Sequence, residues 1–375
     1  MYNLAFIFTE LDDYLRAYPL LNRVRSSKEV DKSYAVFIGE KKDRNLINEQ
    51  IRELDFITFD YSYDHSLTES HEICGFVGST LKTLVESKKI ESLVISGNSE
   101  AALHATRAGN KLGCNIIALD SGLRSDQLQD LQEINRIVID AIADVHLVSE
   151  SSGIENLLKL GVKAETIYKV GYTFLDTLEL IGDVQQPDGV KSDSGYIFLD
   201  VNFDRKDKRQ INIEELLAFS VQLSNVAPIV LSVNSDVAIT SQDFGKYELF
   251  DDKLHFAKDL KLVDKVKYVQ DSLVTVTNQE LTQLICYRYD KQCVTFGKSS
   301  VYTQTILNGK NSNAGNSHEK LVDLVSLKSK EQQPSSKQLT LKLNATNLAF
   351  NAITNGEIEK KNIYAMNAND IEVGW

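Results

Sequence analysis

Short apolar segments alternate with longer amphipathic segments along most of the chain. The apolar segments have four to six residues, and their consecutive apolar positions are typical of strands that are buried on both faces. In the first half, we expect such strands at 4–8, 34–38, 56–59, 92–95, 115–119 and 145–148. Most are followed by a helical pattern, clearest over 66–87 and 131–143, where apolar residues recur at helical spacing. The first half therefore reads as a parallel sheet with helices on both faces.

The alternation pauses in a polar stretch near residues 180–194, which we interpret as a linker. Beyond it, strands are expected at 196–201, 229–233, 273–276 and 293–296, and helices at 212–223, 260–269 and 278–289. From residue 326 the pattern ends, although 339–343 alternates like an exposed strand. We therefore expect an N-terminal domain over 1–180, a second α/β domain over 181–325, and an extension over 326–375 that the pattern does not place.

Length, charge and cysteine usage exclude several classes of function. A chain of 375 residues is typical of two joined domains. Its formal net charge of −12 is unsuited to nucleic-acid binding, which depends on clustered Lys and Arg. No apolar run reaches the roughly 18 residues that a membrane span requires. The four cysteines are scattered without a CxxC pair, which indicates reduced thiols and a cytoplasmic protein.

Polar residues stand at the ends of three expected strands. Asn98, Asp120 and Asn202 each lie at or just after a strand end. Ligands of open α/β sheets bind at the carboxyl ends of the strands, and two such sheets that face each other form a cleft there. These three residues are therefore candidates for a ligand site, although polar residues end strands in every protein of this class.

Three motifs in the first half carry a resemblance to a known family. They are Ile95-Ser-Gly-Asn-Ser99, Ala118-Leu-Asp-Ser-Gly-Leu-Arg124 and Gln132-Glu-Ile-Asn-Arg136. In order and spacing the segment 93–178 resembles the non-hydrolysing UDP-N-acetylglucosamine 2-epimerase family, and a looser similarity continues to about residue 310. The resemblance implies an α/β protein of the GT-B fold, with two Rossmann-like domains and a nucleotide-sugar site between them. It also implies a homodimer, joined by helices of the first domain, and no cofactor.

The family's reaction is an elimination and re-addition at the C1–C2 bond of the sugar. Removing the C2 proton and returning it on the other face requires acid/base groups on both faces of the ring. By resemblance, Asp120 and Glu133 are the expected catalytic residues. The expected substrate-binding residues are Asn98, Arg124, Asn135, Arg136, Asn202, Arg205 and Gln283.

The sequence departs from the family pattern at several of these places. Asn98 replaces an Asp and cannot exchange a proton near neutral pH, and Asp120 replaces a longer Glu. The family's Gly-Thr-Arg-Pro-Glu reads Phe8-Thr-Glu-Leu-Asp12, and only Gln283 remains of a glycine- and glutamate-rich segment. An inactive relative that serves as a binding or assembly component is therefore an alternative to an isomerase. A GT-B glycosyltransferase is a third, but it would require a basic or glycine-rich diphosphate site.

Several candidates also have purely structural interpretations. Glu133 and Arg136, three positions apart on one helix, are spaced for an ion pair. Asn98 could simply cap a strand end, and Asn202 with Arg205 could form an ordinary strand-to-helix turn. No third residue joins the histidines 65 and 71 at metal-ligand spacing, so the sequence predicts no metal site.

Overall fold

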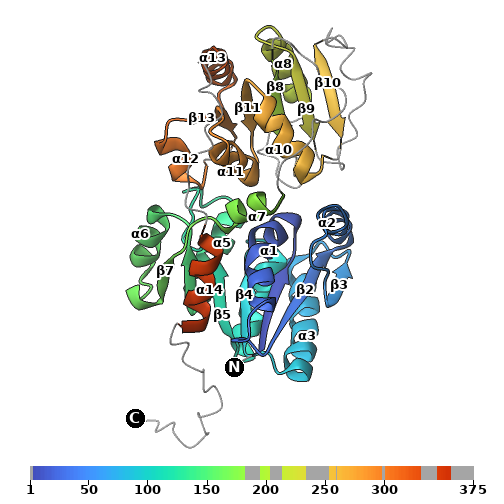
Figure 1. Ribbon diagram of the computed structural model, residues 1–375, viewed down its shortest axis with the longest axis vertical. Coiled ribbons are helices and arrows are strands. Elements are labelled where there is room, and N and C mark those ends of the chain that lie inside the picture. Colours follow the sequence, from blue (N-terminus) through green and yellow to red (C-terminus); the bar gives the residue numbers. More distant parts are fainter. Residues whose placement is uncertain are drawn as a thin grey trace, which may run out of the picture. The chain divides into compact units, whose positions relative to one another are not determined.

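The computed structural model describes residues 3–181, 195–202, 213–233, 253–258, 260–297, 300–330 and 344–355. These residues divide into two compact units, shown in Figure 1. The first contains the described residues up to 124, 128–177 and 344–355, and the second contains 125–127 and the described residues from 178 to 330. The linker expected near 180–194 and the strand expected at 339–343 lie almost wholly outside the described residues.

The first unit is built on a seven-stranded parallel sheet with strand order β3-β2-β1-β4-β5-β6-β7. Its strands are β1 (Asn3–Phe8), β2 (Lys32–Glu40), β3 (Tyr61–His65), β4 (Ser92–Ile95), β5 (Asn115–Leu119), β6 (Val145–Val148) and β7 (Ile167–Lys169). Its helices are α1 (Leu11–Arg25), α2 (Lys41–Leu54), α3 (Ser70–Lys88), α4 (Glu100–Lys111), α5 (Leu131–Ile142), α6 (Ser151–Leu160) and α14 (Ala345–Asn355), with the short η1 (Ala164–Thr166) and the start of α7 (Thr173–Ile181). The central strands β4, β5 and β6 are buried at every position, as expected from their predominantly apolar sequences.

The prediction of a strand at residues 56–59 is wrong. These residues form an irregular segment, and the strand β3 begins only at Tyr61. The apolar character of the segment comes from aromatic packing instead: Phe56 stacks on Tyr18 with ring centroids 3.7 Å apart, and Phe59 packs against Phe8 and Tyr14. β3 is less apolar because it is an edge strand, whose side chains remain partly exposed.

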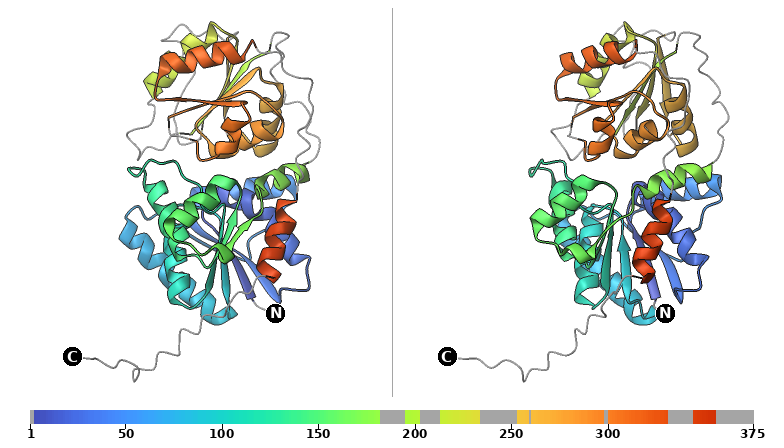
Figure 2. Two further views of the ribbon diagram at one scale, coloured as in Figure 1. Left: turned by 90° about the vertical axis from the view of Figure 1, so that its left-hand side faces the viewer. Right: turned by 60° about the vertical axis from the view of Figure 1, so that its left-hand side comes forward.

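Helix α14, near the C-terminal end of the described chain, packs against α1 of the first unit (Figures 1 and 2). Thr346 donates from both its backbone nitrogen and its hydroxyl to Asp176 Oδ2, at 2.7 and 2.5 Å. The Arg23 guanidinium lies 4.1 Å above the Phe350 ring, a cation–π contact. The extension that the sequence pattern did not place therefore contributes a helix to the first unit.

The second unit repeats the same plan with a six-stranded parallel sheet of order β10-β9-β8-β11-β12-β13. Its strands are β8 (Ile197–Val201), β9 (Ile229–Val233), β10 (Leu254–Lys258), β11 (Val274–Thr277), β12 (Cys293–Phe296) and β13 (Asn311–Gly315). Its described helices are α8 (Ile213–Ser224), α10 (Leu262–Asp271), α11 (Glu280–Arg288), α12 (Thr303–Leu307) and α13 (His318–Lys328). α8 and α13 close its core on the sheet through Leu216, Phe219 and Val325, all buried. No described helix of either unit is long and apolar enough to cross a membrane.

Candidate functional site

The strand order gives each sheet one place where the chain reverses its direction of winding. In the first sheet this switch point lies between β1 and β4, and in the second it lies between β8 and β11. Helical connections leave the two strands of such a pair in opposite directions, which opens space for a ligand at their carboxyl ends. The residues that follow β1, β4 and the adjacent β5 are therefore the first to consider.

A hydrogen-bonded carboxylate joins the ends of β1 and β4. Asp13, in the first turn of α1, accepts from the backbone nitrogen of Thr9 at 3.1 Å, the Thr9 hydroxyl at 2.5 Å and the Glu10 nitrogen at 3.1 Å. The Thr9 hydroxyl also lies 2.8 Å from the hydroxyl of Ser99, which caps α4. A Cβ on Gly97 would lie 2.2 Å from Asp13 Oδ1, so a larger residue there would displace the Asp13 carboxylate. The end of β4 is thus locked onto the start of α1.

Burial shapes the acidity of the carboxylates at this helix start. Burial raises the pKa of Asp13, while the hydrogen bonds from Thr9 and the nearby Arg16 charge oppose the rise. The pKa of Glu10 is raised well above its ordinary value, first by burial and then by the neighbouring negative charge of Asp13.

Asp120 stands at the end of β5 in an unusual backbone conformation. Its φ is +55°, in the left-handed region that few residues other than glycine adopt. Its carboxylate Oδ2 lies 3.6 Å from Nε of Arg16, and both side chains are less than a tenth exposed. Strained backbone of this kind often marks functional sites. Asp120 is thus a nearly buried carboxylate beside an arginine at the carboxyl edge of the sheet.

The first turns of α5 bring four of the expected site residues together. Glu133 is 1% exposed, and its Oε2 lies 3.4 Å from Arg136 Nη1, so the ion pair expected from the spacing is present. Asn135 donates from Nδ2 to the backbone oxygen of Asn98 at 2.9 Å. With its amide oxygen turned toward α5, Asn98 accepts from Nη2 and Nε of Arg136 at 2.7 and 3.0 Å. The Arg136 guanidinium therefore links the end of β4 to Glu133.

Arg124 lies in a separate, internal network. Its Nη1 donates to Asp140 Oδ2 at 2.6 Å and to the Leu123 oxygen at 2.8 Å, and its side chain is only 10% exposed. Asp140 also accepts from the Ser121 hydroxyl at 2.5 Å, and that hydroxyl lies 2.9 Å from Nδ1 of His146. Burial lowers the pKa of His146, as expected for a core histidine with a hydrogen-bonding partner.

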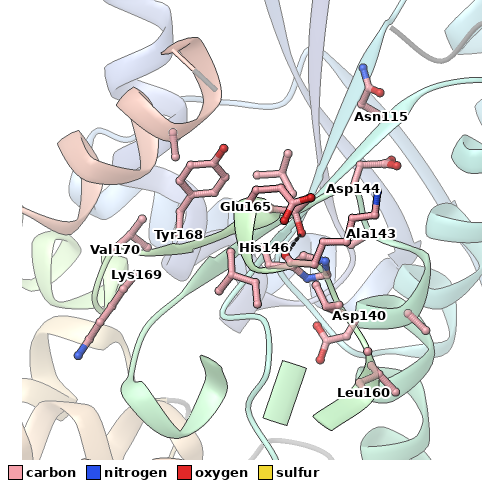
Figure 3. A pocket seen from close by; sticks show the side chains of 18 of the residues that line it. Asn115, Asp140, Ala143, Asp144, His146, Leu160, Glu165, Tyr168, Lys169 and Val170 are labelled. Atoms are coloured by element: carbon pink, nitrogen blue, oxygen red, sulfur yellow. Dashed lines mark hydrogen bonds between the residues drawn. The ribbon is translucent and has the colours of Figure 1, made fainter. Parts of the chain in front are cut away.

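Asp140 and His146 also line a cavity of about 1220 Å³ within the first unit. Figure 3 shows their side chains among those drawn from the end of α5, β6, the segment before β7, and β7 itself. The rest of the lining mixes acidic, basic and apolar side chains, including Asp144, Glu165 and Lys169. This mixture selects no particular class of ligand.

The second unit has a polar arrangement at its own switch point. The Asn278 side chain accepts from the Asn202 backbone nitrogen and donates to the Asn202 oxygen, both at 2.8 Å, which ties the end of β8 to the end of β11. Asp200, which is fully buried in β8, accepts from the Thr282 hydroxyl at 2.6 Å and lies 3.1 Å from Nζ of Lys265. A buried carboxylate paired with a cation at a strand end is a feature that the sequence analysis missed.

Two other residues of this unit were expected to bind the substrate. Gln283 is 4% exposed, and its amide oxygen lies 2.5 Å from the Ser300 hydroxyl and 3.3 Å from Nδ2 of Asn311, so its bonds are internal. Arg205 lies outside the described residues. Within the described residues, no group of three or more His, Cys, Asp or Glu side chains is arranged to hold a metal ion.

Sequence reasoning missed Arg16 and Asp13. Both lie within the amphipathic pattern of α1, where charged residues ordinarily occupy the solvent face. Their burial, at 6% and 3% exposed, is a tertiary property. One signal was present in the sequence: two consecutive acidic residues follow the first apolar strand, at the start of a helix.

Comparison with known proteins shows which family this chain belongs to. The sequence model of the UDP-N-acetylglucosamine 2-epimerase family matches residues 24–344. A UDP-2,3-diacetamido-2,3-dideoxy-D-glucuronate 2-epimerase of Pseudomonas aeruginosa is 22% identical over 298 residues, which is 77% of this chain and 81% of the relative. A UDP-N-acetylglucosamine 2-epimerase of Methanocaldococcus jannaschii is 25% identical over 273 residues, 66% of this chain and 73% of the relative.

Solved structures show the same fold. The crystal structure of the Methanocaldococcus jannaschii UDP-GlcNAc 2-epimerase in complex with UDP-GlcNAc and UDP has a TM-score of 0.79 at 15% identity, covering 94% of this chain and all of that one. The predicted fold class, an α/β chain of the GT-B type with two Rossmann-like domains, is confirmed. With the family model matching most of its length, the chain belongs to the UDP-N-acetylglucosamine 2-epimerase family.

Proposed function

We propose that this protein epimerises C2 of a UDP-N-acetylhexosamine, supplying an activated sugar for surface polysaccharide synthesis. The observation that carries the proposal is the placement of two carboxylates, Asp120 and Glu133, each beside an arginine at the carboxyl edge of the first sheet. Membership of the epimerase family supports the same reaction.

The reaction requires a proton to leave C2 while the C1–O bond to UDP breaks. UDP then returns to C1, and a proton is delivered to the opposite face of C2. Asp120 and Glu133 are our candidates for these proton transfers, because carboxylates can both accept and donate a proton. Arg16 lies beside Asp120, and Arg136 lies beside Glu133, so each candidate carboxylate has a guanidinium next to it.

Asn98 takes a positioning and binding role in this scheme. Its side chain is held by Arg136 and its backbone by Asn135, so the end of β4 is fixed relative to α5. An amide cannot exchange a proton near neutral pH, but it can hydrogen-bond a sugar hydroxyl or acetamido group. We assign Asn98, Asn135 and Arg136 to the sugar on this basis.

We further propose that the second unit binds the nucleotide at its own switch point. Asn202 is exposed there, while its backbone is held by Asn278. The family resemblance adds Arg205 and Gln283, and of these Gln283 would have to exchange internal hydrogen bonds for ligand bonds.

We also propose that the protein is a homodimer joined through α3 and α4. These two helices pack closely on each other in the first unit. Gly75 and Gly78 lie on α3 where an added Cβ would have no atom of another part of the chain within 4 Å. Glycine in a helix interior costs about 0.5–1 kcal/mol relative to alanine, so two such residues on an open face are consistent with the close approach of a second copy.

The test follows UDP-N-acetylglucosamine by proton NMR in the presence of the purified chain. We expect a second anomeric signal, from the C2 epimer, to grow to a constant ratio. Glu133→Gln should slow this by about 10²–10⁴-fold, because it removes one acid/base group, whereas the matched change Glu155→Gln on the exposed part of α6 should not. An unchanged spectrum with the wild-type chain would contradict the proposed function.

A further inference from the structure

Asp140 holds the turn that carries Asp120. It lies in the last turns of α5 and is 3% exposed. Its two carboxylate oxygens accept from three groups of residues 121–124: the Ser121 hydroxyl at 2.5 Å, the Gly122 nitrogen at 3.1 Å and Arg124 Nη1 at 2.6 Å. Hydrogen bonds to a buried carboxylate, one of them from a cation, are the stronger kind.

The turn is constrained from a second side by α6. Gly122 has a φ of +83°, and a Cβ on it would clash with the backbone of Gly153. Asn156 donates from Nδ2 to the Gly122 oxygen at 2.9 Å. Together with Asp140, these contacts fix the backbone immediately after Asp120, whose own φ of +55° is unfavourable.

Asp140 also belongs to the helix that carries Glu133. The two residues are seven positions apart, which is about two helical turns, so they share one face of α5 with Arg136. A rigid helix therefore connects Glu133, near its N-terminal end, to Asp140, which accepts the hydrogen bonds of the 121–124 turn near its C-terminal end.

We propose that Asp140 is a positioning residue that fixes the Asp120 carboxylate relative to Glu133 by joining the 121–124 turn to α5. It contacts neither substrate nor reacting atoms in this scheme. The inference rests on the proposed epimerase function for its catalytic consequence, but its structural part stands on the contacts of Asp140 alone. A displacement of about 1 Å between reacting groups can cost about 10²-fold in rate, so the effect belongs in kcat.

The main test compares Asp140→Asn with the wild-type chain. Asparagine has the same size, but it has a single acceptor oxygen and no charge to balance Arg124. Ser121→Ala is the milder second variant, since it removes only one of the three bonds. The control is Asp60→Asn, because Asp60 likewise accepts from a backbone nitrogen, that of Ala35, and pairs with an arginine, Arg25, away from this turn.

The first readout is hydrogen–deuterium exchange of the peptide that covers residues 119–125. Because a neutral amide oxygen replaces the carboxylate as the acceptor of the Gly122 N–H, this hydrogen bond weakens, and we expect its exchange to accelerate by at least about 10-fold in Asp140→Asn and not in Asp60→Asn. The second readout is steady-state epimerisation, where kcat should fall by about 10–100-fold with KM within about 3-fold of wild type, and Ser121→Ala should show a smaller drop.

Unchanged amide exchange in Asp140→Asn would overturn the inference. So would a kcat equal to that of Asp60→Asn despite accelerated exchange, since the turn would then move without consequence. If the wild-type chain shows no epimerisation at all, the proposed function fails, and the amide-exchange readout still decides whether Asp140 holds the turn.

Discussion

Gly97 shows how a single residue sets the geometry at the end of β4. The Asp13 carboxylate occupies the space where a Cβ of residue 97 would lie, and three hydrogen bonds from Thr9 and Glu10 hold it there. A side chain at this position would displace a carboxylate that cannot move without losing those bonds.

We expect Gly97→Ala to lower the free energy of unfolding by about 1–3 kcal/mol, the cost of breaking hydrogen bonds to a buried charged group. Urea denaturation measures it. If the clash with Asp13 is the cause, the double variant Asp13→Ala/Gly97→Ala should lose less than the sum of the single losses. Strict additivity would show that the penalty arises elsewhere.

His146 gives the chain a defined pH dependence. Because burial lowers its folded-state pKa below the ordinary 6.5, the unfolded chain binds a proton in a pH range where the folded chain does not. Its contribution is absent above pH 6.5 and becomes destabilising as the pH falls below it. We expect His146→Gln to lose less stability than wild type between pH 7 and pH 5 in thermal unfolding, and a parallel loss in both proteins would refute this.

The site residues that the sequence predicts differ from those it misses in the local signal that each carries. Asp120 and Glu133 lie in motifs that resemble those of the epimerase family in order and spacing, so the resemblance identifies them as candidates. Arg16 has no such signal, because nothing local distinguishes a buried arginine in α1 from the partly buried Arg23 or the exposed Arg25 of the same helix. Only the approach of α1 to the end of β5 brings it beside Asp120.

Among the elements, α1 depends on α7 for a backbone hydrogen bond. Pro19 lies inside α1 and has no N–H to donate to the Leu15 carbonyl one turn earlier. The Thr177 hydroxyl donates to this carbonyl at 2.6 Å, and Thr173 donates to the Arg16 oxygen at 2.7 Å. The start of α7 therefore anchors the helix that carries Asp13 and Arg16.

We expect Thr177→Val, which keeps the shape and removes the hydroxyl, to destabilise the chain by about 1–3 kcal/mol, because it leaves a buried carbonyl without its donor. The control is Thr166→Val, since the Thr166 hydroxyl donates to the Lys163 carbonyl at 2.9 Å at an exposed site. Equal losses in the two variants, measured by urea denaturation, would show that burial of the Leu15 carbonyl is unimportant.

Periodicity predicted most elements but failed where tertiary packing decides the structure. The aromatic residues at 56–59 resemble a strand in sequence, yet they pack as a loop against the core. β7 was missed because three residues are too few for a pattern. α14 was not predicted, and the extension that contains it could not be placed, because its partners, among them Arg23 and Asp176, are far away in sequence.

At the scale of the whole molecule, we predict a homodimer joined through α3 and α4. We expect light scattering at micromolar concentration to give the mass of two chains, with an interface above roughly 1,000 Å². Gly75→Arg should produce a folded monomer, because a Cβ at position 75 meets nothing within one chain, while a long charged side chain there would enter the α3 surface of a second copy. A wild-type monomer, or a variant that remains dimeric, would exclude this interface.

The central claim is that Asp120 moves the proton at C2, and solvent deuterium measures this directly. UDP-N-acetylglucosamine is incubated with the chain in D₂O, and deuterium at C2 is followed by NMR, which detects proton exchange even when net epimerisation is slow. We expect the wild-type chain to incorporate deuterium and Asp120→Asn to do so about 10²–10⁴-fold more slowly. Equal incorporation by the two proteins would contradict the role of Asp120, and no incorporation by the wild-type chain with any common UDP-N-acetylhexosamine would show that this fold serves recognition rather than catalysis.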